Sequence, residues 1–118
     1  MERNYQKFPE TENGNVLWQL TQKLGVLPDE ILVDFAIIFP TYENALKFGM
    51  FLLKFGYRVQ VNNLEDFPDV DKNGYMGEVI VGIFMEINEP SLTQAENWLA
   101  ENSKSLNGKN DGWGFLGD

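Results

Sequence analysis

The chain has 118 residues, is 43% hydrophobic and 14% aromatic, and carries 18 acidic side chains against 9 basic ones. A chain of this length buries roughly two thirds of its unfolded surface, so we expect residues 1–118 to form a single domain. The net charge of −9 disfavours direct contact with nucleic acid or with an anionic membrane surface. Because Cys and His are absent, the usual nucleophile, general base and transition-metal ligands are missing, and we expect neither catalysis nor a metal or other cofactor.

The sequence lacks a segment with the character of a signal peptide or a membrane span. Residues 1–4 are polar, and the longest apolar run, 35–39, is far shorter than either kind of segment requires. We therefore expect a soluble, cytoplasmic protein.

Hydrophobic periodicity divides the chain into helices and strands. Helical stretches carry apolar residues every three or four positions, as in Leu17, Leu20 and Leu24, whereas strands alternate apolar and other residues. Glycine or proline follows several of these stretches and marks their ends, as Gly25 and Pro40 do. The predicted elements are, in chain order, a helix over 13–24, a strand over 31–39, a helix over 42–55, a strand over 57–61, a strand over about 77–87, a helix over 91–106 and a short last strand or turn over 111–116.

The order of these elements predicts the fold class. After the first helix, the chain runs strand-helix-strand twice, and two such units with right-handed crossovers interleave into one four-stranded antiparallel sheet. The expected fold is therefore an α+β, ferredoxin-like sandwich with two helices on one face of the sheet and an additional N-terminal helix. A capping-box pattern, Ser91 with Gln94, is expected to open the last helix.

The segment Asp111-Gly112-Trp113-Gly114 places a large aromatic side chain between two glycines. Glycine on both sides indicates a tight turn or a bulged terminal strand, in which the backbone comes close to a neighbouring element. Trp113 either plugs one end of the core or stands at a functional surface.

Three segments, read together, resemble the regulator of ribonuclease activity B (RraB) family, the protein inhibitors of RNase E. They are residues 34–40, residues 53–59 and the closing motif Asp111-Gly112-Trp113-Gly114, which is the most specific of the three. The similarity spans residues 8–115, nearly the whole chain. The resemblance implies a ferredoxin-like fold and a small, acidic, cytoplasmic protein that binds the ribonuclease and has no catalytic activity of its own.

One face of the predicted sheet has no helix to cover it. Strand alternation places an apolar centre of Ile38, Ile80 and Phe84 on this open face, with charged residues such as Arg58 at its rim. We predict that these four residues, with Trp113 nearby, bind a protein partner or a second copy of the chain. The alternative is that the first helix lies across the open face and makes it core.

The acidic loop before the third strand partly matches a calcium-binding loop. Asp69, Asp71, Asn73 and Gly74 occupy positions one, three, five and six of an EF-hand, but Ile80 stands at position twelve, where a bidentate Glu is required. An acidic turn between two strands explains the same residues, so no metal site is predicted.

Other readings of the surface remain open. Met50, on the polar side of the second helix, is either an adaptable contact or an ordinary exposed apolar residue. Asp34, Glu78 and Glu86 share the open face and are the available candidates for acid/base chemistry, although solvating charge explains them equally well. A small-molecule-binding or self-associating regulatory domain is the alternative to a ribonuclease regulator, but a glycine-rich phosphate loop is lacking.

Overall fold

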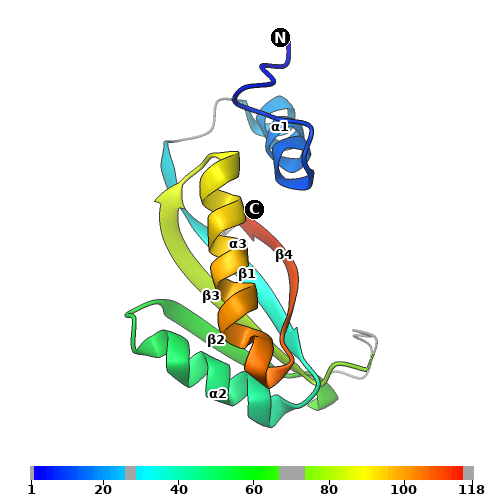
Figure 1. The fold of residues 1–118 in the computed structure, drawn as a ribbon, viewed down its shortest axis with the longest axis vertical. Coiled ribbons are helices and arrows are strands. Elements are labelled where there is room, and N and C mark those ends of the chain that lie inside the picture. The colour runs from blue at the N-terminus through cyan, green and yellow to red at the C-terminus, as the bar shows by residue number, and fades with distance from the viewer. Residues whose placement is uncertain (1, 26–28, 67–73, 116–118) are drawn as a thin grey trace.

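The structure is a computed structural model that describes residues 2–25, 29–66 and 74–115 (Figure 1). The longest helix of the described ranges has 15 residues, and none of their helices is long and apolar enough to cross a membrane. The elements are α1 (Glu12–Leu24), β1 (Glu30–Phe39), α2 (Tyr42–Leu53), β2 (Arg58–Asn63), a 3-10 turn (Leu64–Asp66), β3 (Gly77–Glu86), α3 (Glu89–Ser103), a second 3-10 turn (Lys104–Leu106) and β4 (Lys109–Phe115).

The four strands form one antiparallel sheet in the order β2-β3-β1-β4. The two central strands pair along their full length, from Glu30 opposite Glu86 to Phe39 opposite Gly77. In this order the strands of the two strand-helix-strand units interleave, which is the ferredoxin-like arrangement. The predicted fold class is confirmed.

Two helices cover one face of this sheet. The odd-numbered residues of β1 and β3 point to that face, as the period of two along a strand requires; they are buried from Val33 to Phe39 and from Gly77 to Val81, and half-buried at Ile31, Ile83 and Met85. Figure 1 shows α2 and α3 crossing the same side of the sheet, with α2 near β2 and α3 near β4. The fully buried core consists mainly of Val33, Phe35, Ile37, Phe39, Phe48, Leu52, Val79, Val81, Leu92 and Leu99.

Helix α1 lies against α3, beyond the end at which α3 begins (Figure 1). Leu17 of α1 is 1% exposed and belongs to the same buried cluster as Phe35, which points to the helix-covered face. The alternative in which the first helix crosses the open face is therefore wrong, and that face is left uncovered by the described helices.

The ends of two helices differ from the prediction. Asn88, and not Ser91, caps α3, because the Asn88 side chain accepts a hydrogen bond from the backbone N–H of Ser91 at 2.8 Å. Pro90 then stands in the first helical turn, where its missing N–H costs nothing. Helix α2 ends at Leu53, so Phe55 lies beyond it and is 54% exposed.

Gly77, at the start of β3, supports the packing of the sheet on α2. A Cβ at this position would lie 2.6 Å from the Thr41 carbonyl oxygen and 2.7 Å from the Ala45 Cβ, so Gly77→Ala must push α2 away from β3. We expect Gly77→Ala to lower the free energy of unfolding by about 1–3 kcal/mol in urea titrations. The matched control is Gly114→Ala in β4, where a Cβ meets open space; it should change stability by less than about 0.5 kcal/mol. Equal stability of the two variants would contradict this account.

Candidate functional site

The open face of the sheet carries the even-numbered residues of β1, β2 and β3. Strand register aligns Asp34, Gly82 and Arg58 in one row across three strands, and Leu32 stands directly opposite Phe84 in the next row. A hollow of about 320 Å³ lies around Gly82, because this residue has no side chain to fill it. The floor and walls of the hollow are formed by Asp34, Arg58, Val59, Gln60, Ile80 and Gly82.

The predicted apolar centre of the open face is only partly accessible. Phe84 is 66% exposed, Arg58 is exposed and Ile80 is half-buried, so these three residues present a surface to solvent. Ile38 is 4% exposed and cannot contact a partner in this conformation. Leu32, which the prediction omitted, is half-buried beside Phe84 and extends the apolar area. The accessible anchor is therefore the Phe84 end of the face.

Two carboxylates face each other at that end. Glu30 of β1 and Glu86 of β3 are directly opposite in register, and both are exposed. Among the described residues, no lysine or arginine forms an ion pair with either carboxylate. Like charges directly opposite each other across two strands are unfavourable. This end of the sheet thus carries two negative charges that no described lysine or arginine neutralises.

The three candidate acid/base residues are not brought together. Glu78 and Glu86 are eight residues apart on β3, which is roughly 27 Å at the rise of a strand, and Asp34 lies in a row between them. The Glu78 carboxylate accepts a hydrogen bond from the Asn62 amide at 3.0 Å. Within the described residues, no group of three or more acidic side chains is arranged to hold a metal ion. Asp69, Asp71 and Asn73 of the calcium-like loop lie outside the described residues.

The closing motif forms a bulge in β4. Asn110 pairs with Ile37 and Trp113 pairs with Phe35, so two residues of β4 stand opposite the single residue between Phe35 and Ile37. The second of these, Gly112, has a φ of 101°, a conformation that side-chain-bearing residues rarely adopt. The prediction of a bulged terminal strand is confirmed.

The bulge turns Trp113 toward the helices. Because Trp113 stands opposite Phe35, its side chain lies on the helix-covered face, where it packs against the core and is half-buried. The prediction that Trp113 lies near the open face is therefore corrected. Its indole Nε1 donates a hydrogen bond of 2.9 Å to Oδ1 of Asn13 in α1.

Asn13 connects three elements of the fold. It is 7% exposed, and its amide nitrogen donates to Thr93 Oγ1 at 3.1 Å and to Glu96 Oε1 at 2.6 Å, both in α3. Through these two bonds and the bond from Trp113, the Asn13 amide in α1 is hydrogen-bonded to both α3 and β4. The sequence did not predict this role, because an asparagine at the start of a helix is explained by capping alone. The partners become apparent only when chain segments 80 to 100 residues apart are in place.

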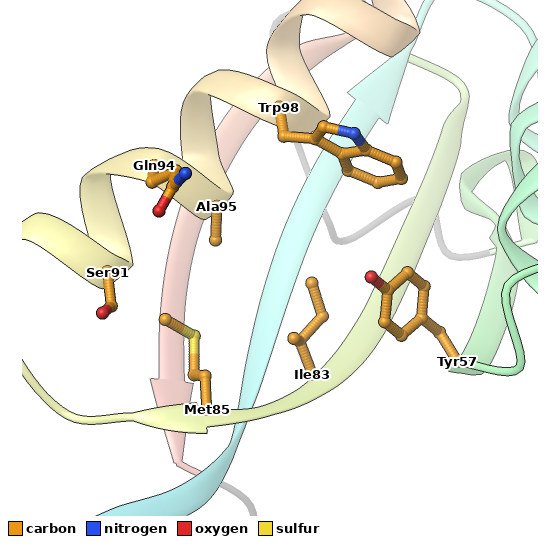
Figure 2. A pocket seen from close by; sticks show the side chains of 7 residues that line it. All are labelled: Tyr57, Ile83, Met85, Ser91, Gln94, Ala95 and Trp98. Atoms are coloured by element: carbon orange, nitrogen blue, oxygen red, sulfur yellow. The ribbon is translucent and has the colours of Figure 1, made fainter.

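An apolar groove, which the prediction also missed, lies on the helix-covered side between α3 and the end of β3 (Figure 2). Figure 2 shows Ile83 and Met85 extending from β3 toward α3, with Tyr57 and Trp98 on the side nearer α2. Its volume is about 350 Å³, and the lining is Tyr57, Ile83, Met85, Ser91, Gln94, Ala95 and Trp98.

An aromatic cluster forms the wall of this groove. Trp98 packs edge-on against Tyr57, with ring centroids 6.2 Å apart, and edge-on against Phe55, with centroids 5.4 Å apart. Phe51 stacks on Trp98 from the core side at 6.1 Å. Because these rings hold one another, the groove has a rigid aromatic side without depending on a bound ligand.

Comparison with known proteins identifies the family. The family model described as "Regulator of ribonuclease activity B" (RraB) matches residues 10–115. The search of curated proteins returned no match to this chain.

The hydrogen bond between Trp113 and Asn13 generates a stability prediction. Trp113→Phe retains an aromatic ring but leaves the buried Asn13 oxygen without its indole donor. Trp18→Phe is the matched control, because Trp18 packs on Phe8 at 5.4 Å and its indole donates no hydrogen bond among the described residues. We expect Trp113→Phe to be the more destabilising by about 1–2 kcal/mol in urea titrations. Equal losses for the two variants would show that the hydrogen bond contributes nothing beyond packing.

Proposed function

Since the chain belongs to the RraB family, whose model covers residues 10–115, we propose that it regulates a ribonuclease of the RNase E type by binding to the enzyme. The regulator makes and breaks no covalent bond. It acts in the cytoplasm, by obstructing the ribonuclease or by changing its conformation.

The exposed Phe84 is the observation that carries the choice of contact surface. A phenylalanine 66% exposed on a sheet face, with Leu32 beside it, Ile80 two rows away and charges around it, has the composition of a protein interface. In contrast to a pocket for chemistry, this face spreads Asp34, Glu78 and the opposed pair Glu30 and Glu86 over three separate rows. The arrangement supports binding over catalysis.

Electrostatics favour a basic partner surface. The chain carries a net charge of −9, and the open face contributes Glu30, Asp34, Glu78 and Glu86 against Arg58 and Lys109. Basic segments of a ribonuclease are the segments that hold RNA. An acidic regulator that docks on them competes with RNA for the same positive charge.

Replacing the exposed phenylalanine tests the contact surface. Phe84→Glu should weaken binding to a purified RNase E-type ribonuclease at least about tenfold in calorimetry, and should weaken inhibition of RNA cleavage in parallel, because a charge replaces the apolar anchor. Met50→Glu is the matched control. Met50 is 65% exposed on α2, on the other side of the sheet, and its variant should bind as the wild type does. Wild-type binding by a folded Phe84→Glu protein would remove the open face from the proposal.

Ionic strength tests the electrostatic part of the proposal. Affinity for the ribonuclease should fall as salt rises above about 0.15 M, because the charges of two exposed surfaces are increasingly screened. Calorimetric titrations at several salt concentrations measure this slope. An affinity that does not change with salt would show that competition for basic segments is not the mechanism.

A further inference from the structure

The sheet contains a strand edge that its own chain leaves unpaired. Strand β3 extends from Gly77 to Glu86, but β2 pairs with it only as far as Gly82, opposite Arg58. Residues 83–86 therefore have β1 on one side and no strand on the other. The groove of Figure 2 lies directly above this stretch, because Ile83 and Met85 form its floor.

The chain turns away from β3 at a defined point. Gly56, the residue that would stand opposite Phe84 if β2 continued backwards, has a φ of 81° and lies in the turn that follows α2. Its N–H bonds to the Leu53 carbonyl in that turn and not to β3. The vacant edge is thus created by the positive φ of a glycine and is a built feature of the fold.

Hydrogen-bond alternation shows which groups face the vacancy. The Ile87 N–H donates to the Asp29 carbonyl on the β1 side, which places the backbone groups of odd-numbered β3 residues toward β1. Because neighbouring residues of an antiparallel strand direct their backbone groups to opposite sides, those of even-numbered β3 residues face the β2 side. The N–H and C=O of Phe84 and the N–H of Glu86 consequently point into the vacant position, and none of them has a backbone partner among the described residues.

The two faces of this edge differ in chemistry. On the helix side lies the apolar groove, walled by Tyr57 and Trp98. On the open side stand the exposed Phe84 and the opposed carboxylates of Glu30 and Glu86. A strand added here would alternate between the two environments, because successive side chains of a strand point to opposite faces.

We propose that an extended segment of a protein partner adds to β3 along residues 84–86, antiparallel to it, with an apolar side chain in the groove and a basic side chain beside Glu86. The residue opposite Met85 enters the groove beside the aromatic wall of Tyr57 and Trp98. Its neighbour, opposite Glu86, lies on the open face, where a lysine or arginine relieves the repulsion between Glu86 and Glu30. Main-chain hydrogen bonds provide the docking, and these two side chains provide the selectivity.

This inference deepens the proposed function, because it names the kind of segment through which a ribonuclease would be held, but its first test does not require a ribonuclease. The probe is a peptide of alternating lysine and leucine, Lys-Leu-Lys-Leu-Lys with blocked ends. Titrated into isotope-labelled full-length protein, it should shift the backbone amide signals of Phe84 and Glu86 and the indole signal of Trp98. Glutamate in place of lysine, or serine in place of leucine, should reduce affinity about tenfold or more.

Two N-methylated peptides test strand pairing itself. With leucine in the groove, the lysine residues have the backbone N–H groups that face β3. Methylation of the lysine nitrogens should abolish binding, whereas methylation of the leucine nitrogens should leave the affinity within about twofold. Equal binding of both methylated peptides would overturn the proposal, since it would leave only a diffuse electrostatic association.

Variants of the protein test the two environments separately. Ala95→Arg fills the groove and should weaken peptide binding about tenfold. Glu86→Lys reverses the charge of an exposed side chain, leaves the core intact and should weaken binding about three- to fivefold. Met50→Glu should have no effect. If Ala95→Arg fails to fold, Glu86→Lys and the methylated peptides decide; unchanged affinity in Glu86→Lys overturns the choice of a basic residue.

Measuring ribonuclease binding in parallel with peptide binding distinguishes failure of this inference from failure of the proposed function. Peptide binding as expected, with no effect of the protein on any RNase E-type enzyme, would refute the proposed function and leave the strand addition standing. Ribonuclease binding that survives in Glu86→Lys, together with failure of the peptide to shift Phe84 and Glu86, would refute the strand addition and leave the proposed function standing. Shifts confined to β2 with a doubled molecular mass would identify a second copy as the occupant and overturn the partner proposed here.

Discussion

One-sided burial of the sheet is the constraint on which the rest of this structure depends. Alternation along β1 and β3 sends Phe35, Ile37, Val79 and Val81 to one face, and α2 and α3 cover that face completely at these positions. With about 25 cal/mol gained per Å² of apolar surface removed from water, this packing is the dominant favourable contribution to folding. None of the helices α1, α2 and α3 covers the opposite face, and its Phe84 end is therefore available for contacts with other molecules.

The same constraint explains why the first helix is joined to the last strand. A third helix cannot join the covered face without displacing α2 or α3, so α1 docks at the end of α3 and buries only part of its apolar side. Leu17 enters the core, whereas Leu24 remains 49% exposed. Because α1 buries little apolar surface, its position also depends on hydrogen bonds. Asn13 accepts one from Trp113 and donates to Thr93 and Glu96. The closing motif Asp111-Gly112-Trp113-Gly114 is thus explained as a structural link between the last strand and the first helix.

Features that depend on neighbouring residues in the sequence could be predicted, whereas features that depend on contacts between distant segments could not. Periodicity predicted α1, α2, α3 and the strands β1 to β3, and the odd-even division of β3 was predicted residue by residue, because these signals are local. For the last segment, the sequence allowed either a strand or a turn. Helix ends were less accurate: Asn88 and Ser91 are both good caps, and only the path of the chain selects between them. Sequence could place Ile38 on the open face but not its burial, since neighbouring side chains decide exposure. The groove at Trp98 and the position of α1 depend on contacts between distant segments and were not predictable.

The bulge at Asp111 and Gly112 has a consequence for assembly. A sheet grows into a filament only if both of its outer strands accept a neighbour, and a bulge interrupts the regular spacing of hydrogen-bonding groups that a neighbour requires. Strand β2 is regular along its whole pairing with β3, whereas β4 is not. Pairing with another strand is therefore favoured on the other side of the sheet, where β2 and residues 83–86 of β3 present their edges. The bulge in β4 thus disfavours open-ended polymerisation of sheets, because growth past β4 meets an irregular row of hydrogen-bonding groups.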